Sequence, residues 1–164
     1  MKKPHIILVD DQADVLSALM QDLAPFKDKF ILDDCESAKE ASELLEELDA
    51  CDGQTALIMA DHIMPNKNGI EFLSDLAEVD SLAHVRKVLI TGQASHSDTI
   101  DAINNALIDY YVSKPWVVET LHAVVKKMIT LWVLDSGLNH HDFEAFIDTK
   151  VLFRRLKNEG GTKH

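Results

Sequence analysis

Residues 5–11 read HIILVDD, an almost unbroken run of apolar residues that ends in two aspartates. Such a run is typical of a strand that is buried on both faces of a parallel sheet, because neither face meets water. Directly afterwards apolar residues recur at helical spacing over Asp14–Leu23, and this pattern stops before Pro25. The opening of the chain therefore predicts a buried strand followed by an amphipathic helix.

The same alternation recurs along the chain. Four more apolar runs predict strands at Phe30–Leu32, Thr55–Ala60, Val85–Ile90 and Asp109–Val112. Between and after them we expect four more helices. One opens at a capping box over Ser37–Glu40, and a second spans Ile70–Val79. A third runs from Ser97 or Asp98 to Ala106, and a fourth starts after Pro115. This alternation predicts an α/β fold, a parallel sheet with helices on both faces and right-handed crossovers.

The charge balance of the chain is strongly acidic. Sixteen Lys and Arg residues face 28 Asp and Glu residues, which gives a formal net charge of −12 over 164 residues. A surface of this sign repels phosphate backbones and anionic membranes, so we expect neither a nucleic-acid nor a membrane partner. Because 46% of the residues are hydrophobic, the chain can bury a core, which excludes disorder as its main state.

The cysteines and the apolar runs bear on the compartment. Cys35 and Cys51 suggest neither a disulfide framework nor a zinc site. The first apolar run is too short for a signal peptide, and no later stretch approaches a membrane span. We expect a cytoplasmic protein.

Five polar side chains follow the predicted strands at their carboxyl ends. They are Asp10, Asp11, Asp61, Thr91 and Lys114. Because parallel strands end at one edge of the sheet, these side chains should meet in the crevice where such sheets bind ligands. Each alone has an ordinary explanation, such as a helix cap or a solvated loop charge, but five successive coincidences favour a site.

The chemistry of this set points to a metal and a phosphoryl group. Three crowded carboxylates repel one another, so that one must be protonated or a cation must lie between them. Oxygen ligands suit Mg²⁺, and a metal beside Lys114 suits the charge of a transferring phosphoryl group. A carboxylate in that setting can be the nucleophile and form an aspartyl phosphate.

Four segments make the sequence resemble the receiver domains of two-component response regulators, the CheY-like superfamily. They are Ile7–Asp11, Asp61–Gly69, Leu89–Gly92 and Tyr111–Trp116, and the D-x-x-M-P-x-x-x-G run in the second is highly specific. The resemblance implies a flavodoxin-like sheet of five strands in the order 2-1-3-4-5. It further implies a receiver domain over residues 1–130 and a helical extension over residues 131–164, continuous with the last receiver helix.

The resemblance also implies roles for the carboxylates. Asp61 would accept a phosphoryl group from a sensor histidine kinase or a phosphotransfer protein. Asp11, Asp61 and the backbone carbonyl of Ile63 would bind Mg²⁺, and Asp10 would act mainly through a metal-bound water. We therefore expect a signalling domain whose output is a change in protein contacts with a downstream partner, and not an enzyme.

The remaining implied roles concern the switch. Thr91 and Lys114 would contact the phosphoryl oxygens, and Tyr111 would be the aromatic ring that turns inward as Thr91 moves. The peptide between Lys114 and Pro115 would be cis, which proline permits at low cost.

Three neighbours of the site lead to expectations about dephosphorylation and solvent exposure. Ile63 cannot hydrogen-bond an attacking water, which predicts slow self-dephosphorylation, although Gln93 could partly compensate. His62 flanks the expected phosphoacceptor, and we interpret it as a solvent-facing loop residue.

The adjacent His140 and His141 would point in different directions on a helix, so we expect no metal there.

The chain continues beyond the expected receiver helix. Apolar residues extend to about Leu134, Gly137 could end that helix, and His141–Leu156 predicts a second amphipathic helix. We expect this helix to pack back on the first, so that Phe143, Phe146 and Ile147 meet Trp132 and Met128, and surplus apolar surface to form a homodimer. The alternative is an intramolecular cap on a monomer. Basic residues are expected at the C-terminal end of this helix, where they oppose its dipole: Lys150, Arg154, Arg155 and Lys157.

Two other functions remain open at this point. One is a Mg²⁺-dependent phosphohydrolase with an aspartyl-phosphate intermediate, although such enzymes typically have a second Asp where Ile63 stands. The other is a receiver fragment of a larger effector protein.

Overall fold

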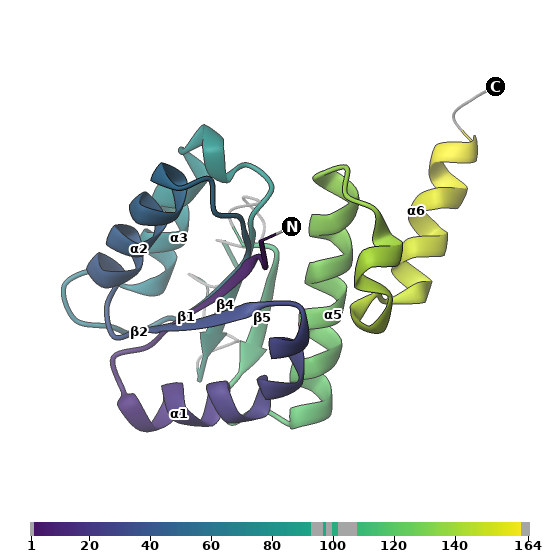
Figure 1. Cartoon of the computed structure of the whole chain (residues 1–164). Coiled ribbons are helices and arrows are strands. Elements are labelled where there is room, and N and C mark those ends of the chain that lie inside the picture. Colours follow the sequence, from purple (N-terminus) through teal and green to yellow (C-terminus); the bar gives the residue numbers. More distant parts are fainter. Residues whose placement is uncertain (1, 93–96, 98–99, 102–107, 162–164) are drawn as a thin grey trace.

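Five parallel strands form one sheet, as the sequence predicts. The computed structural model describes residues 2–92, 97, 100–101 and 108–161. The strands lie in the order β2-β1-β3-β4-β5, which confirms the flavodoxin-like fold (Figure 1). Their bounds are β1 His5–Val9, β2 Ile31–Cys35, β3 Thr55–Asp61, β4 Arg86–Thr91 and β5 Tyr110–Ser113.

Helices cover both faces of the sheet and enclose two apolar clusters. The larger cluster lies under α1 and α5, and the second lies under α2 and α3. The α-helices are α1 Ala13–Asp22, α2 Ala38–Ala50, α3 Gly69–Ala77, α5 Val118–Asp135 and α6 Thr149–Gly161, and the 3-10 helices are η1 Ala24–Asp28, η2 Asp80–Leu82 and η3 His140–Phe146. Of the helix expected from Ser97 or Asp98 to Ala106, only Ser97, Ile100 and Asp101 are described, and they are helical. The rest of this prediction lies outside the described residues. Among the described residues, no helix is both long enough and apolar enough to span a membrane.

Strand β2 differs from the prediction because it lies at the edge of the sheet. It extends to Cys35 and so contains Asp33 and Asp34, which interrupt the apolar pattern. An edge strand tolerates such residues because one of its sides is open to solvent. Asp33 accepts a hydrogen bond or ion pair from His5 at 2.6 Å, whereas Phe30 leaves the strand and is buried in the core.

The C-terminal segment is not the single helix that its periodicity predicts. The 3-10 helix η3 ends at Phe146, the backbone is extended at Ile147, and α6 begins at Thr149. Asp148 causes the break, since its Oδ1 accepts hydrogen bonds from the amides of Lys150 and Val151 at 3.0 and 3.3 Å and thereby caps α6.

The expected packing of this segment against α5 is nevertheless present. The ring of Phe143 lies 5.8 Å from Trp132 and 5.7 Å from Phe30, between centroids, and Phe146 lies 5.2 Å from Phe26. These residues belong to the same cluster as the sheet residues, and Trp132 is only 3% exposed. The chain thus covers the extended face of α5 itself, as an intramolecular cap requires, and the homodimer stays a prediction.

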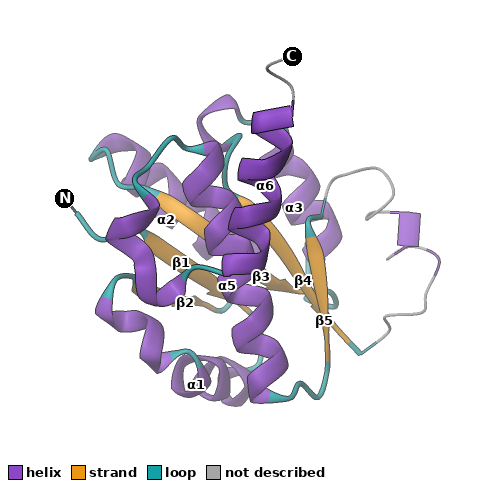
Figure 2. Cartoon of the chain, turned by 90° about the vertical axis from the view of Figure 1, so that its right-hand side faces the viewer, coloured by secondary structure: helices purple, strands orange, loops and turns teal. Residues whose placement is uncertain are grey.

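Helix α6 lies on the outside of α5 and presents part of its surface to solvent (Figure 2). Leu152 is buried, but Phe153 is 67% and Leu156 44% exposed. The expectation that the four basic residues oppose the dipole at the C-terminal end is wrong, because α6 begins at Thr149 and runs on to Gly161. Lys150 lies in the first turn of this helix, and its last turn holds no basic residue.

An ion-pair network joins α6 to the amino end of the sheet. Arg155 lies 2.7 Å from Asp135 at the end of α5, and Asp135 also pairs with Arg86 at the start of β4. Arg86 lies 3.5 Å from Asp109, before β5. These four residues are called the arginine cluster below.

Candidate functional site

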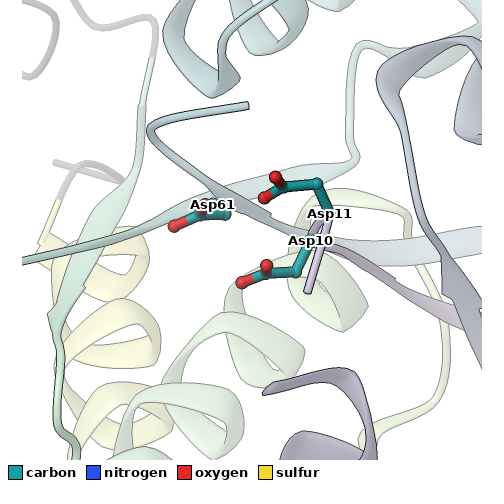
Figure 3. A group of neighbouring side chains, drawn as sticks. All are labelled: Asp10, Asp11 and Asp61. Atoms are coloured by element: carbon teal, nitrogen blue, oxygen red, sulfur yellow. The ribbon is translucent and has the colours of Figure 1, made fainter. Parts of the chain in front are cut away.

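Four of the five residues predicted from strand ends lie close together: Asp10, Asp11, Asp61 and Lys114. One oxygen of each carboxylate of Asp10, Asp11 and Asp61 lies within 4.8 Å of the others, and Figure 3 shows the three side chains together at the ends of β1 and β3. The Lys114 ammonium lies 2.9 Å from Asp10 Oδ2 and 2.8 Å from Asp61 Oδ1. These residues, called the aspartate site below, lie at the predicted edge of the sheet.

The two aspartates after β1 have different surroundings. Asp10 is completely buried, and its Oδ1 accepts a hydrogen bond from the Gln12 amide at 2.9 Å. Its own amide donates to the Cys35 carbonyl at 3.1 Å. Asp11 is exposed, so one carboxylate is fixed by the protein and the other faces water.

The charges at the site do not balance. Burial raises the pKa of the Asp61 carboxyl, the hydrogen bond from Lys114 lowers it in part, and the charges of Asp10 and Asp11 raise it further. Burial alone would lower the pKa of Lys114, but its hydrogen bonds to Asp61 and Asp10 outweigh that effect and raise it. Three carboxylates thus share one ammonium, and excess negative charge remains.

The donor set fits a hard divalent cation. Carboxylate oxygens are the ligands that Mg²⁺ prefers, and their spacing leaves room for an ion that keeps several waters. Ile63, whose carbonyl the resemblance adds to this set, lies in the loop directly after Asp61, with its side chain 60% exposed.

The loop after Asp61 is shaped by glycine. A Cβ at Gly69 would lie 2.1 Å from the Asp61 carbonyl oxygen, so only glycine allows this close approach. The Gly69 amide donates to the His62 carbonyl at 2.9 Å, and Asn68 caps α3 by accepting from the Glu71 amide. Gly69 therefore allows the start of α3 to lie close against the backbone of Asp61.

Thr91 and Lys114 lie on adjacent strand ends. The Lys114 amide donates to the Thr91 carbonyl at 2.9 Å, and Thr91 itself is 1% exposed. The expected cis peptide between Lys114 and Pro115 is present.

His62 is the residue that the sequence interpretation misplaced. It is 6% exposed, and its Nδ1 lies 3.3 Å from Thr91 Oγ1. Its amide donates to the Ile90 carbonyl at 2.9 Å, which places it beside β4 rather than in a solvent-facing loop. The interpretation of His62 as solvent-facing is wrong because β3 pairing with β4 continues one residue past Asp61.

Tyr111 has its ring at the surface. The residue is 38% exposed, and its ring stacks on Tyr110 with centroids 6.3 Å apart. Lys127 Nζ lies 5.3 Å from the Tyr110 ring centroid on the same side of the molecule. The Tyr111 side chain is therefore partly exposed to solvent in this structure.

Comparison with known proteins agrees with this geometry. A family model for the response regulator receiver domain matches residues 6–126. The chain belongs to the response regulator receiver family. Receiver domains are signalling modules, and this one has the family's fold and its cluster of aspartates.

Two curated relatives and one solved structure show the extent of the similarity. The chain is 29% identical over 154 residues to the hydrogenase transcriptional regulatory protein HoxA of Cupriavidus necator, covering 94% of this chain and 30% of HoxA. It is 29% identical over 127 residues to the chemotaxis protein CheY of Halobacterium salinarum, covering 77% of this chain and 97% of CheY. A signal receiver domain from Pseudomonas fluorescens Pf-5 superposes with a TM-score of 0.68 at 25% identity, covering 80% and 98% of the two chains.

The similarity to HoxA continues beyond the residues that the family model matches. The chain nevertheless spans only about 30% of the length of that relative, whereas it contains nearly the whole of CheY.

Proposed function

We propose that this receiver accepts a phosphoryl group on Asp61 from a sensor histidine kinase or a phosphotransfer protein. The carrying observation is the position of the Asp61 carboxylate, 2.8 Å from the Lys114 ammonium and within 4.8 Å of two further carboxylates. An oxygen of Asp61 attacks the phosphorus, the bond from phosphorus to the donor breaks, and the donor leaves with that electron pair. The product is an aspartyl phosphate.

The surrounding residues of this chain position and neutralise the reacting groups. Lys114 offsets negative charge on the phosphoryl oxygens, and the Thr91 hydroxyl donates to one of them. Asp10, Asp11, Asp61 and the Ile63 carbonyl would hold Mg²⁺, which supplies positive charge to the transferring group when bound. The raised pKa of Asp61 is caused first by burial and then by the charges of Asp10 and Asp11. It supports this proposal, because a bound cation would offset both effects.

In this proposal the signal is a small conformational change near Asp61 that alters the surface of the domain. Thr91 shifts toward the phosphoryl group, the Tyr111 ring turns inward, and a downstream protein recognises the changed surface. The similarity to HoxA and CheY supports signalling through protein contacts, either as a single receiver or as the receiver of a larger effector.

We further propose a division by role within the chain. Residues 1–130 would carry the phosphoryl chemistry, and residues 131–164 would form an extension that supplies a contact surface. The exposed Phe153 and Leu156 on α6 support this view, since apolar residues that remain at a surface often mark an interface.

Acetyl phosphate with Mg²⁺ tests the phosphoacceptor directly. Intact mass measurement should show one added phosphoryl group on the native chain and none on Asp61→Asn. Asp80→Asn, at an exposed aspartate far from the site in sequence, is the matched control and should label normally. Labelling of Asp61→Asn at the native rate would contradict the assignment, and many turnovers of a phosphate ester would instead favour a phosphohydrolase.

Metal binding is tested separately. Titration with Mg²⁺ or Mn²⁺ should show weak binding to the native protein and loss of binding in Asp11→Ala. Asp14→Ala changes an exposed aspartate in the first turn of α1 and should bind normally. Unchanged affinity in Asp11→Ala would count against the proposed ligands.

A further inference from the structure

The side chain of His62 is confined by its backbone and its burial. Its amide donates to the Ile90 carbonyl and its carbonyl accepts from the Gly69 amide, both at 2.9 Å. Its side chain is 6% exposed and ends 3.3 Å from the Thr91 hydroxyl. The backbone of His62 is therefore held on both sides, and its buried ring lies against Thr91.

Thr91 has one hydroxyl proton to donate. In the proposed function that proton is donated to a phosphoryl oxygen on Asp61. If the neutral imidazole carries its proton on Nε2, then Nδ1 is an acceptor and competes for the same hydroxyl proton. The opposite tautomer would donate to the Thr91 oxygen and would not compete for the hydroxyl proton. The state of His62 Nδ1 therefore decides whether His62 opposes or assists the switch.

We propose that His62 is a positioning residue that holds the Thr91 hydroxyl away from the phosphoryl position through an unprotonated Nδ1. The inference rests on the proposed function and deepens it. The unphosphorylated state is stabilised by this hydrogen bond, which must break before Thr91 can contact the phosphoryl group. His62 thus sets part of the equilibrium between the two states of the receiver.

Substitutions at His62 test the hydrogen bond without altering the charged groups of the site. His62→Phe keeps a ring of similar size and removes the acceptor, whereas His62→Asn places an oxygen close to the position of Nδ1. With beryllofluoride and Mg²⁺ as the mimic of the phosphoryl group, His62→Phe should bind roughly fivefold tighter than the native protein, which corresponds to about 1 kcal/mol. His62→Asn should bind with native affinity.

A double-mutant cycle separates positioning from a general effect on packing. In a Thr91→Ala background there is no hydroxyl to hold, so His62→Phe should no longer change the beryllofluoride affinity. An equal gain with and without the Thr91 hydroxyl would overturn the proposal, as would an unchanged or weaker affinity of His62→Phe in the native background.

The tautomer gives a test on the unaltered protein, which remains decisive if His62→Phe does not fold. In protein labelled with ¹⁵N-histidine, and with His62 assigned by comparison with His62→Asn, the imidazole shifts should show a proton on Nε2 and none on Nδ1. A proton on Nδ1 would overturn the proposal. Failure of the native protein to bind beryllofluoride would instead refute the proposed function, so the two failures can be told apart.

Discussion

The two ends of the β-sheet differ in the balance of their charged side chains. At the carboxyl end, the aspartate site gathers three carboxylates, and one ammonium pairs with two of them. At the amino end, the arginine cluster sets two guanidinium groups against two carboxylates. The first end retains an excess of negative charge, which the proposed function uses for a metal and a phosphoryl group. The second end is neutral and joins the C-terminal segment to the sheet. The comparison teaches that clustered charges can leave an excess at one end of a sheet and hold elements together at the other.

The apolar contacts of the C-terminal segment should give the largest effect on stability. Phe143 is 1% exposed and contacts both Phe30 and Trp132, so Phe143→Ala should destabilise the fold by about 3–5 kcal/mol. Urea unfolding measures the loss. Phe153→Ala, which truncates a phenylalanine that is 67% exposed, should change stability by less than about 0.5 kcal/mol. Similar losses in both variants would mean that the C-terminal segment does not share the core.

The arginine cluster itself should contribute less. Burial lowers the pKa of the Arg86 guanidinium, which shows that its charge is partly removed from water. Asp135→Asn takes away a partner of both Arg86 and Arg155 and should cost about 1–2 kcal/mol, since the groups keep some solvent. The control is Asp75→Asn in the exposed ion pair with Lys67, which should cost about 0.5 kcal/mol or less. Equal losses would remove the distinction between the cluster and an ordinary surface pair.

At the aspartate site, in contrast, removal of a charge should stabilise the fold. In the folded protein the pKa of Asp61 is raised above its ordinary value of 3.8. Between these two pKa values the folded state binds more protons than the unfolded state, so the stability of the fold falls as the pH rises through this range. Without metal at pH 7, Asp61→Asn should therefore raise the melting temperature by roughly 2–4 °C, or about 1 kcal/mol. The gain should vanish below about pH 4, where the Asp61 carboxyl of the unsubstituted protein is protonated in both the folded and the unfolded state.

Magnesium provides a second measure at the same site. It should stabilise the native protein by mass action and leave Asp61→Asn nearly unchanged, so that the difference between them shrinks. A destabilising effect of Asp61→Asn at pH 7 without metal would show that the carboxylates are not in excess.

The smallest effect on stability is expected on the outer face of α6. The double variant Phe153→Ser, Leu156→Ser should leave unfolding almost unaltered, because both side chains are exposed. The predicted homodimer, in contrast, should be lost. Light scattering at tens of micromolar, with and without acetyl phosphate, checks this. A native protein that is monomeric in both conditions would leave the C-terminal segment as an intramolecular cap alone.

The sequence predicts most of the sheet and the residues at its functional edge, because buried parallel strands are marked by continuous apolar runs. Edge strand β2 was only partly predicted, since Asp33 and Asp34 hide it from a pattern based on burial. The break at Ile147 was missed because apolar spacing continues across it, although Asp148 followed by Thr149 is a readable cap.

The misplacement of His62 has a different cause. A polar residue after a strand is usually solvated, and only the pairing of its amide with Ile90 brings its ring against Thr91. Local periodicity carries no information on that pairing, because the two residues are distant in sequence and meet only in the folded sheet. Contacts across strands are what the sequence pattern leaves undetermined.

The aromatic packing around Phe30 bears on how this protein is handled at the bench. Phe30 is covered by Phe143 and Phe146 from the C-terminal segment as well as by Trp132. A chain shortened to residue 126, where the match to the receiver family model ends, would uncover these rings in water. Such a fragment should be prone to aggregation, and phosphorylation rates measured on it would describe a damaged core. Any shortened version intended for assays should keep the segment at least through α6.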